Sequence, residues 1–312
     1  MPIMRAISQR SIGGPEVLEV VEVERPAPGP GEVLVRVRAV GVNPADRKVR
    51  SGHVRLFGDP PFTLGHEFSG VAVESGRDAD SFRSGDQVFG WVTPPHGAYA
   101  DYVVVPQTSL AAGPTTLDHV HAAALPIAGL TAWQALVKVA QVHAGQRVLV
   151  HGAAGGVGHL AVQIAKTCGA YVIGTARAAK HGFLRELGAD ELIDHTAEDF
   201  TRTRDVDVVL DTVSGETGLK SLATLSPDGV VIDVVGIGFD RTAVKERAAA
   251  SGLRFVEYNL DPGPGDLTAL ADLVDRGGVR PSVQETLPLT EAAKAHELGE
   301  SGRVRGKVVL VP

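Results

Sequence analysis

The sequence contains almost no cysteine. Cys168 is the only one among 312 residues, so no disulfide can form within the chain and a cysteine-rich zinc cluster is excluded. Hydrophobic residues make up 44% of the chain and charged residues 21%, the ordinary composition of a globular protein of one large or two average domains. Because Cys168 falls on the apolar side of a predicted helix, we expect it to be buried in a core.

The sequence also lacks long apolar stretches and long basic runs. No segment is apolar over the roughly 20 residues that span a bilayer, and the N-terminus has no hydrophobic signal segment. The formal net charge of −7 argues against non-specific binding of nucleic acid. We therefore expect a cytoplasmic protein whose partners include neither a nucleic acid nor a membrane.

Valine-rich segments broken by glycine and proline dominate the chain up to residue 117. Their spacing predicts a compact, mainly antiparallel, barrel-like domain. The predicted strands are Leu18–Val23, Glu32–Val42, Phe68–Ser75, Gln87–Trp91 and Tyr99–Pro106.

The composition changes near residue 118. The alanine-rich segment Asp118–Ala140 is predicted to be helical, with an interruption at Pro126. Strands and helices then alternate, which predicts an α/β fold with a doubly wound parallel sheet. The predicted strands are Arg147–His151, Tyr171–Thr175, Glu191–Asp194, Val206–Val213, Gly229–Val235 and Arg254–Asn259, and the predicted helices are Gly156–Cys168, Ala179–Leu187, Gly215–Leu225 and Arg241–Ala250.

The tail of the chain leaves two arrangements open. Helices are predicted at Asp266–Arg276 and Thr290–Gly299, and strands at Val283–Leu287 and Lys307–Val311. These elements either extend the parallel sheet or return to the first domain, which would then be discontinuous. Periodicity does not decide between them.

The most informative segment runs from Val148 to Gly158. A β-branched strand stops in a cluster of glycines and a helical pattern begins at once. Glycines let the backbone approach phosphate oxygens, and free N–H groups at a helix start face the anion, so we predict a dinucleotide site. A tight turn that binds nothing is the alternative. The residues expected at the cofactor are Gly152, Ala153, Gly155, Gly156, Val157 and Gly158.

The strand after this turn indicates which dinucleotide binds. A site for NAD usually has Asp or Glu about 20 residues after the glycines. Here the strand ends at Thr175 and the next acid is Glu186, so no carboxylate is placed to repel a 2′-phosphate. Arg177 and Lys180 are placed to pair with that phosphate, which predicts NADPH, unless both cations are simply solvated.

Five further segments accompany the glycine turn: Gly41–Asp46, Gly65–Gly70, Leu125–Pro126, Leu130–Trp133 and Gly306–Leu310. Together they resemble the medium-chain dehydrogenase/reductase superfamily, and within it the zinc-independent quinone oxidoreductase branch. The resemblance implies a discontinuous, GroES-like catalytic domain over residues 1–117 and 262–312. It also implies an NADP-binding Rossmann domain over residues 118–261, an active site between the two domains, and a homodimer.

The segment Gly65–Gly70 is also the signature of the zinc alcohol dehydrogenases in this superfamily, in which His66 would be a zinc ligand. Those enzymes have a thiolate at the position of Asn43 and another near Ile127, so both sulfur ligands are missing here. Catalytic zinc needs about three protein ligands, and we therefore expect no bound metal. His66 then either hydrogen-bonds the substrate or Asp46, or is an inherited histidine with no chemical role.

Without a Lewis acid, oxidation of a simple alcohol is difficult, whereas reduction of an electron-poor acceptor is easier. We therefore expect direct hydride transfer from NADPH to a small electrophile, namely a quinone or an α,β-unsaturated carbonyl compound. The resemblance makes the Asn43 amide a donor to the acceptor oxygen, although Asn43 could equally fix the turn before Pro44. Tyr258 is the best candidate for a proton donor, besides water, but it could be an ordinary strand-end tyrosine.

The resemblance implies further contacts with the cofactor. Thr131 would lie near the nicotinamide carboxamide, and Val213 and Gly236 would line the nicotinamide side. Lys307 would lie near the phosphates, unless it is a surface lysine at a strand start. His195 stands where the family often has a tyrosine near the adenosine, and it could bond the ribose or a phosphate.

Two other functions remain open from the sequence. An enoyl reductase that acts on acyl chains held by a carrier protein would share the fold and the glycine turn, and its preference for carrier-bound enones would identify it. An NADPH-binding sensor or scaffold without turnover is the non-enzymatic alternative. Oxidation of NADPH by quinones or enones would exclude it.

Overall fold

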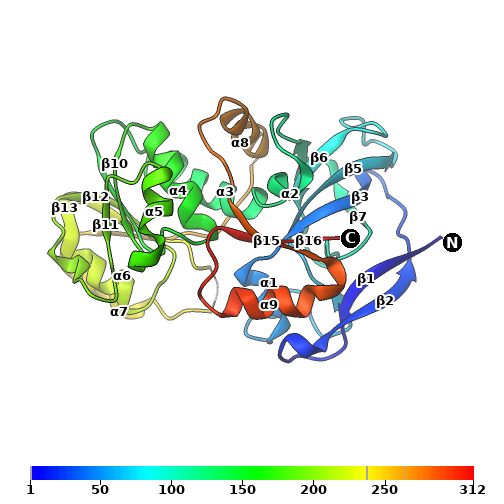
Figure 1. Cartoon of the computed structure of the whole chain (residues 1–312), viewed down its shortest axis with the longest axis horizontal. Helices are drawn as coiled ribbons and strands as arrows, with labels where there is room; N and C mark the ends of the chain where they lie inside the picture. The colour runs from blue at the N-terminus through cyan, green and yellow to red at the C-terminus, as the bar shows by residue number, and fades with distance from the viewer. Residues whose placement is uncertain (1, 237, 264) are drawn as a thin grey trace. The chain divides into compact units, whose positions relative to one another are not determined.

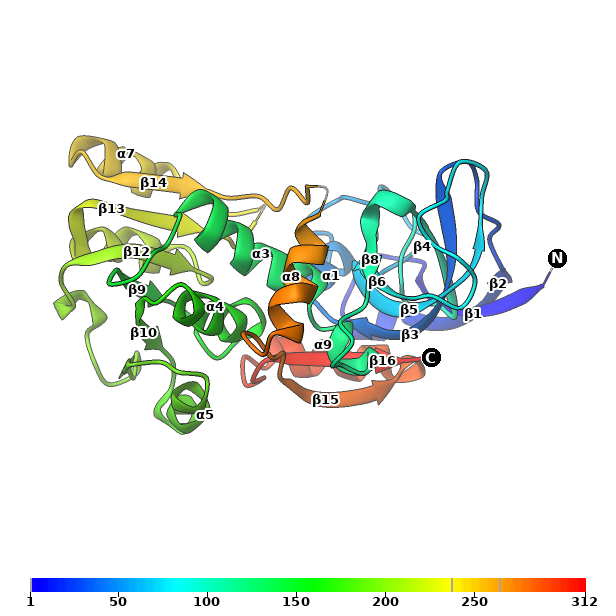
Figure 2. The ribbon, with the colours of Figure 1, turned by 90° about the horizontal axis from the view of Figure 1, so that it is seen from above.

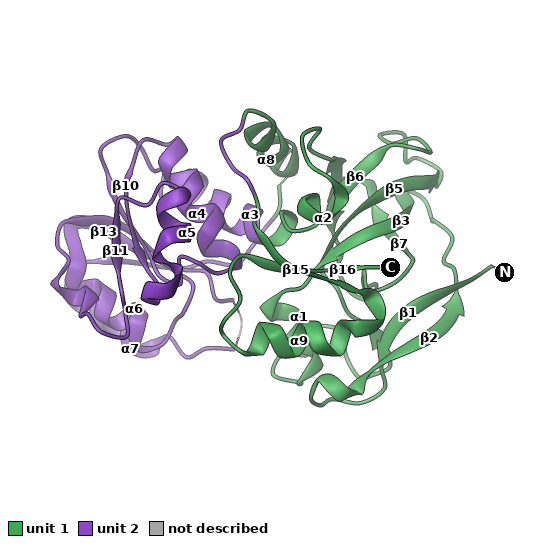
Figure 3. Cartoon of the chain, in the orientation of Figure 1, with its two compact units in different colours: residues 1–127, 262–276, 281–312 green, residues 128–261, 277–280 purple. Residues whose placement is uncertain are grey.

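The computed structural model of the chain describes residues 2–236, 238–263 and 265–312. The chain divides into two compact units, coloured separately in Figure 3. Unit 1 comprises residues 1–127, 262–276 and 281–312, and unit 2 comprises residues 128–261 and 277–280.

Unit 1 is built on two β-sheets. The larger has seven strands in the order β15-β16-β3-β5-β6-β8, with β7 also paired to β3, and the smaller has the order β2-β1-β4. β3 pairs antiparallel with β5, β7 and β16, so it lies at the centre of the larger sheet. The strands are β1 (Ile3–Gln9), β2 (Leu18–Glu24), β3 (Glu32–Gly41), β4 (Phe62–Thr63), β5 (Glu67–Ser75), β6 (Gln87–Trp91), β7 (Tyr102–Pro106), β8 (Leu110–Ala112), β15 (Val283–Pro288) and β16 (Lys307–Val311).

A valine-rich core holds unit 1 together. Alternate residues of β3, such as Val33, Val35 and Val37, pack with Phe68 and Tyr99 in one cluster. This alternation is the pattern of strands with one face buried. The helices of unit 1 are α1 (Pro44–Arg50), α2 (His119–Ala122), α8 (Asp266–Asp275) and α9 (Ala292–Glu300).

The tail of the chain returns to the first unit. β16 pairs antiparallel with β3 through Val309 and Leu310, and β15 pairs parallel with β16. Figure 1 shows both strands, at the red end of the colour scale, beside β3. The second arrangement left open by the sequence is therefore the observed one, because the apolar strand Lys307–Val311 extends the sheet of unit 1.

Unit 2 contains a six-stranded, wholly parallel sheet in the order β11-β10-β9-β12-β13-β14. Figure 2 shows β10, β9, β12 and β13 as successive neighbours. The order reverses at β9, which is the point where doubly wound sheets bind ligands at their carboxyl ends. The strands are β9 (Arg147–Val150), β10 (Tyr171–Thr175), β11 (Glu191–Ile193), β12 (Val206–Asp211), β13 (Leu225–Asp233) and β14 (Arg254–Glu257).

The helices of unit 2 connect these strands. Buried apolar residues of α4, including Leu160, Ile164 and Ala165, follow the predicted helical spacing. The alanine-rich segment forms α2 and, from Pro126, a second helix that passes from α to π geometry at Gln134–Val139. The helices are α3 (Pro126–Trp133), α4 (Gly156–Thr167), α5 (His181–Glu186), α6 (Glu216–Ser221) and α7 (Thr242–Ala250).

Several details differ from the expectations, among them the strands β1, β4 and β8, which were not predicted. Pro44–Arg50 is a helix, because Asn43 and Asp46 form a reciprocal capping box at its start. Cys168 is half-buried rather than buried, because it lies at the C-cap of α4. Residues 118–127 belong to unit 1, where Ala123 and Ala124 pack against strand residues in a small separate core.

Candidate functional site

Unit 1 contains a buried cluster of three polar side chains, Asn43, Glu67 and Lys307. Asn43 follows β3 and caps α1, Glu67 begins β5, and Lys307 begins β16. Because β3 lies between β5 and β16, the sheet brings together residues up to 264 positions apart. The three residues are 4%, 0% and 3% exposed, so their polar groups depend on one another rather than on water.

Hydrogen bonds occupy the polar groups of this cluster. Lys307 Nζ donates to Glu67 Oε1 at 2.6 Å, to Asn43 Oδ1 at 2.7 Å and to the Val42 carbonyl at 3.1 Å. Asn43 Nδ2 donates to Glu67 Oε1 at 2.8 Å, and Glu67 Oε2 accepts from the Ile127 N–H at 2.7 Å. The buried ammonium and carboxylate therefore neutralise each other with their bonding capacity used.

These contacts restrict the roles predicted for Asn43 and Lys307. Asn43 directs its amide hydrogens at protein groups, so a bond to an acceptor oxygen requires the amide to exchange partners. Lys307 has three acceptors within its own unit, so a contact with cofactor phosphate would likewise require it to leave them. Both roles stay predictions.

Asp46 connects this cluster to His66. The Asp46 carboxylate accepts from the Asn43 N–H at 2.7 Å and from the Gly65 N–H at 3.1 Å, and its Oδ1 lies 2.6 Å from His66 Nδ1. Burial acts to raise the pKa of Asp46, but the charge of His66 and the hydrogen bonds together lower it. Asp46 is therefore a carboxylate, and His66 Nδ1 carries the hydrogen between them.

The second ring nitrogen of His66 is different. Burial acts to lower the pKa of His66, but Asp46 outweighs it and raises that pKa. Nε2 is buried and has no hydrogen-bond partner among the residues that the structure describes. The Phe57 ring meets the imidazole edge to face, with 5.6 Å between the ring centroids. His66 thus has one polar atom left for a ligand.

The side chains present do not fit a catalytic zinc ion. His66 offers Nε2 alone, and the Asn43 oxygen already accepts from the Lys307 ammonium. Glu67, the neighbouring carboxylate, is paired with the same ammonium. Within residues 2–236, 238–263 and 265–312, no group of three or more His, Cys, Asp or Glu side chains could hold a metal ion.

In unit 2 the glycine turn joins β9 to α4. Gly152 has φ +61°, a conformation that side chains disfavour. A Cβ at Gly158 would lie 2.4 Å from the Gly152 oxygen and 2.7 Å from the Ala153 Cα, so only glycine fits there. The N-cap of α4 is Gly155, and no side chain caps it. The uncapped helix start beside bare backbone fits the pyrophosphate of a dinucleotide.

The end of β10 carries the residues expected to select the cofactor. Arg177 is exposed, Lys180 is half-buried, and Thr175 is buried, where its Oγ1 accepts from the Gly152 N–H at 3.3 Å. The expectation that no carboxylate lies nearby needs a correction. Asp194, which follows the neighbouring strand β11, accepts from the Ala178 N–H at 3.1 Å. The Asp194 carboxylate is therefore bonded to the residue that directly follows Arg177.

The remaining predicted residues are spread over unit 2. Val213 is exposed after β12, Gly236 has φ +79° after β13, and His195 is exposed after β11. All three follow carboxyl ends of parallel strands, where a cofactor is expected. Thr131 is buried on α3, and the Tyr258 hydroxyl is buried and donates to Gln134 Oε1. Proton donation by Tyr258 would require it to leave Gln134.

A buried histidine beside the glycine turn, His151, is not among the predicted site residues. His151 Nδ1 lies 3.1 Å from Thr175 Oγ1 and Nε2 lies 2.9 Å from Ser221 Oγ. Burial lowers its pKa to about 3, so the ring is neutral at physiological pH. His151 stands directly before Gly152, but no sequence pattern indicates partners 24 and 70 positions away.

A buried ion pair in unit 2 was also missed. The Arg241 guanidinium binds Asp233 through two hydrogen bonds, at 3.0 and 2.9 Å, and both side chains are almost fully buried. Arg241 also donates to the Gly236 carbonyl at 2.8 Å. The pair therefore holds the loop that carries Gly236 against the end of β13.

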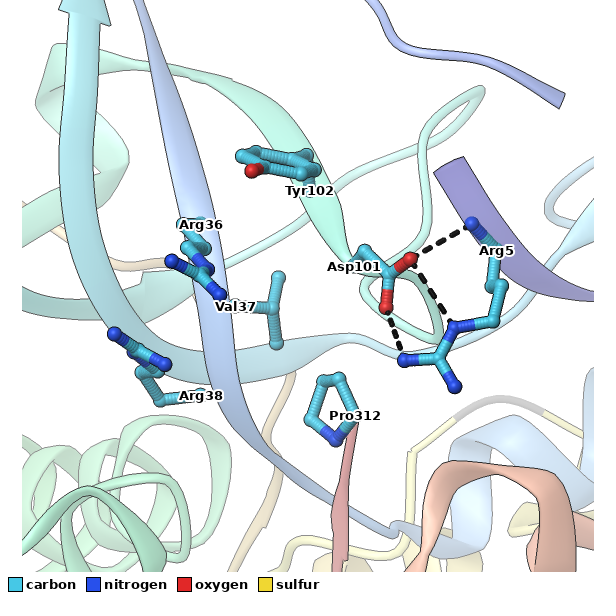
Figure 4. Close-up of a pocket in the computed structure, with 7 residues that line it drawn as sticks. All are labelled: Arg5, Arg36, Val37, Arg38, Asp101, Tyr102 and Pro312. Atoms are coloured by element: carbon cyan, nitrogen blue, oxygen red, sulfur yellow. Dashed lines mark hydrogen bonds and ion pairs between the residues drawn. The ribbon is translucent and has the colours of Figure 1, made fainter. Parts of the chain in front are cut away.

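A surface pocket of unit 1 lies apart from these groups. Arg5 and Asp101 form an ion pair at its side, as Figure 4 shows. None of the predicted site residues lines it. Its lining residues are Arg5, Arg36, Val37, Arg38, Asp101, Tyr102 and Pro312.

The two units together define a class of protein, an oxidoreductase with a dinucleotide-type parallel sheet and a separate β-unit. Two family models match the chain. Residues 29–115 match the alcohol dehydrogenase GroES-like domain, and residues 187–310 match a model described as zinc-binding dehydrogenase. The second description names a metal for which the side chains described in the structure provide no group of three or more ligands.

Similar proteins identify the family more closely. A 2-haloacrylate reductase from Burkholderia sp is 34% identical, with 99% of each chain covered. The solved structure of a quinone oxidoreductase from Coxiella burnetii has a TM-score of 0.94 and 37% identity, and it covers 100% of each chain. The structure of Escherichia coli quinone oxidoreductase complexed with NADPH has a TM-score of 0.90 and 29% identity, covering 99% of this chain and 100% of that one.

The chain belongs to the medium-chain dehydrogenase/reductase superfamily, in its quinone oxidoreductase branch. The predicted family, the predicted α/β fold with a GroES-like part, and the prediction of an oxidoreductase are confirmed. Among the described residues, no helix has both the length and the apolar character required to cross a bilayer.

Proposed function

We propose that this protein is an NADPH-dependent, metal-independent reductase of quinones or α,β-unsaturated carbonyl compounds. The observation that carries the proposal is the glycine turn, which opens onto the uncapped start of α4, together with the exposed Arg177 at the end of β10. The first feature supports a dinucleotide, and the second supports a phosphorylated ribose.

The chain's own residues would hold the cofactor as follows. The N–H groups at the start of α4, from Gly156 onward, would bind the pyrophosphate, and Gly158 would keep the helix close to β9. Val213 and the loop that carries Gly236 would lie against the nicotinamide end of the cofactor. Arg241 would hold that loop through its bond to the Gly236 carbonyl. When bound, NADPH supplies a hydride to the acceptor.

The preference for NADPH depends on competing charges. Arg177 and Lys180 would attract the 2′-phosphate, whereas the Asp194 carboxylate would oppose it. Because guanidinium and ammonium groups make charge-assisted bonds to phosphate, we expect the attraction to prevail. The Escherichia coli relative, whose solved structure is a complex with NADPH, supports the same choice.

The acceptor class follows from the polar groups available in unit 1. A quinone or a conjugated carbonyl moves the incoming negative charge onto an oxygen, where hydrogen-bond donors can stabilise it without a metal. His66 Nε2 can donate such a bond when the ring is protonated, a form that the Asp46 carboxylate favours, and Asn43 could supply a second if its amide exchanged partners. Relatives named for quinones and for 2-haloacrylate, an activated alkene, fit this class.

Three measurements on the purified protein test the proposal together. We expect titration to give tighter binding of NADPH than of NADH, elemental analysis to find no stoichiometric zinc, and a panel of quinones and enones to oxidise NADPH. Turnover that requires added zinc contradicts the metal-independent mechanism. Tight NADPH binding without turnover of any acceptor supports the sensor function instead. A strong preference for carrier-bound enones supports the enoyl reductase.

A double substitution tests the phosphate assignment. Arg177→Ala with Lys180→Ala should weaken NADPH binding at least about tenfold, since each charge-assisted bond contributes roughly 1.5–3 kcal/mol. NADH binding should change little. Arg185→Ala, an exposed arginine on α5, is the matched control for loss of charge. Equal weakening of both cofactors would refute the assignment.

Asn43→Ala tests the acceptor site. We expect turnover to fall more than cofactor affinity, because the residue lies in unit 1 and not at the glycine turn. Unchanged turnover at full folding would remove Asn43 from the mechanism.

We further propose that the protein is a cytoplasmic homodimer. This rests on the family resemblance, and light scattering during size-exclusion chromatography with cell fractionation would test it. A monomer, or a membrane-bound or organellar protein, would contradict it.

A further inference from the structure

A row of buried polar side chains extends behind Asp46, and the proposed function does not use it. Tyr99 Oη lies 3.0 Å from His296 Nε2, and His296 Nδ1 lies 3.0 Å from Arg50 Nη1. Tyr99 and His296 are 0% exposed and Arg50 is 3% exposed. All belong to unit 1, although His296 comes from α9 near the end of the chain.

The direction of each hydrogen bond follows by elimination. Arg50 can only donate, so His296 Nδ1 accepts from it. Burial lowers the pKa of His296 to about 4, so the ring is neutral and its single hydrogen is on Nε2. Nε2 therefore donates to the Tyr99 oxygen, and the Tyr99 O–H is left to donate elsewhere.

Asp46 is the acceptor for that O–H. Burial raises the pKa of Tyr99 well above its ordinary value, and the charge of Asp46 and the hydrogen bond to it add to the effect. Tyr99 thus keeps its hydrogen and points it at the carboxylate. Asp46 then receives hydrogen bonds from Tyr99, Asn43, Gly65 and His66, all of them donors.

We propose that Tyr99, with His296 behind it, is a positioning residue that fixes the Asp46 carboxylate against His66, so that the protonated His66 ring directs its Nε2–H at the acceptor. This inference rests on the proposed function for the identity of the acceptor. The Asp46 carboxylate can only accept hydrogen bonds, so His66 Nδ1 must donate to it, and Nε2 is the ring nitrogen left to face a ligand.

The burial of these groups supports a positioning role. Polar side chains are costly to bury, and this row leads from the partly exposed Glu300 through Arg50 to Asp46 and His66. The terminal atom, His66 Nε2, has no partner among the described residues. Unpartnered buried polar atoms are rare in native proteins, and a bond to the bound acceptor would give this one a partner.

Tyr99→Phe tests the inference, because it keeps the ring and removes only the hydroxyl. Tyr102→Phe, in the same unit and beside the pocket of Figure 4, is the matched control. We expect Tyr99→Phe to lower kcat for a quinone or an enone about tenfold, with NADPH affinity unchanged, and Tyr102→Phe to leave both unchanged.

Nitrogen NMR of histidine-labelled protein supplies a readout that a purely structural role would not move. In the wild type we expect the hydrogen on His66 Nδ1 to stay in one environment, bonded to Asp46. In Tyr99→Phe the His66 signals should shift or broaden between environments, while the His151 signals stay in place. If both kcat and the His66 signals match those of the Tyr102→Phe control, the inference is overturned. A shifted His66 signal with unchanged kcat overturns its link to the reaction.

His296 provides a second test if Tyr99→Phe does not fold. In His296→Gln the side-chain amide can still accept from Arg50 and donate to Tyr99, whereas His296→Ala can do neither. We expect the glutamine variant to keep kcat within about threefold of the wild type and the alanine variant to resemble Tyr99→Phe. Equal kcat in the two variants overturns the inference. If the wild type reduces no acceptor, the proposed function fails, and the NMR comparison alone decides whether Tyr99 positions His66.

Discussion

The two units build their polar sites in different ways. In unit 2 the glycine turn is one continuous segment, from Gly152 to Gly158, and its groups are backbone atoms. In unit 1 the site consists of side chains from separate strands, and Lys307 and Asn43 are 264 positions apart. A continuous backbone site depends on local geometry, whereas a site of distant side chains depends on the whole sheet and on matched charges.

The largest expected effect comes from breaking the charge pair of unit 1. Lys307→Met would leave the Glu67 carboxylate buried without its ammonium, and loss of one partner of a buried pair costs about 3–5 kcal/mol. Chemical denaturation should give this loss in the free energy of unfolding. The double variant Glu67→Gln with Lys307→Met should recover a large part of it, since no uncompensated charge remains. A single variant as stable as the wild type would contradict the importance of this pair.

The next effect comes from crowding the continuous site of unit 2. Gly158→Ala would push a methyl group against the backbone of Gly152 and Ala153, and overpacking of this kind costs about 1–3 kcal/mol. NADPH binding, followed by fluorescence, should be lost or strongly weakened. Gly182→Ala on α5, where a methyl group meets nothing within 4 Å, should leave both stability and binding unimpaired. Normal NADPH binding by Gly158→Ala would count against the turn as the site.

Acid should weaken each unit through a buried histidine. The pKa is lowered by burial to about 3 for His151 in unit 2 and to about 4 for His296 in unit 1. Both values lie below the ordinary 6.5, so the unfolded chain takes up protons first. Stability is then full above pH 6.5 and is lost as the pH falls toward these values, at about 1.4 kcal/mol per pH unit for each histidine.

Denaturation curves between pH 7 and pH 5 measure this slope. His151→Gln should remove the contribution of unit 2 and His296→Gln that of unit 1, so each variant should be less sensitive to acid than the wild type. Slopes equal to that of the wild type would mean that these rings are not buried and neutral.

The smallest effect should come from an ion pair at the surface. Lys166 Nζ lies 2.8 Å from Asp190 Oδ2 in unit 2, but both side chains are about one-third exposed. Exposed pairs contribute roughly 0–1 kcal/mol, so Lys166→Ala should lower the free energy of unfolding by no more than about 1 kcal/mol. The N–O distances of the two pairs are similar. A comparison of Lys166→Ala with Lys307→Met therefore shows how burial, rather than distance, affects the free energy of unfolding. A loss as large as that of Lys307→Met would show that burial is not what distinguishes them.

Local patterns predicted most of the strands and helices. The strands Gln87–Trp91, Tyr171–Thr175 and Lys307–Val311 have the predicted bounds, because apolar runs ended by glycine, proline or charge define a strand locally. The helix α1 was missed because its start depends on Asn43 and Asp46 capping each other, and that pattern resembles a turn before proline.

The candidate site was predictable only in part. The glycine turn was found because all its requirements lie within a few residues. The roles of Tyr99, His296 and His151 were not found, because their partners are strands or helices apart and no local pattern connects them. The carboxylate of Asp194 was missed for the same reason, since it follows a different strand from Arg177.

The sequence by itself determined most of the strands and helices, the dinucleotide-type turn and the missing cysteine ligands, because each is a property of neighbouring residues or of composition. Only the tertiary structure decided that the tail joins the first sheet and that Lys307 pairs with Glu67. It alone decided that His66 is left with one free nitrogen. Those outcomes depend on which buried charges and strand edges meet in space, and chain neighbours do not specify them.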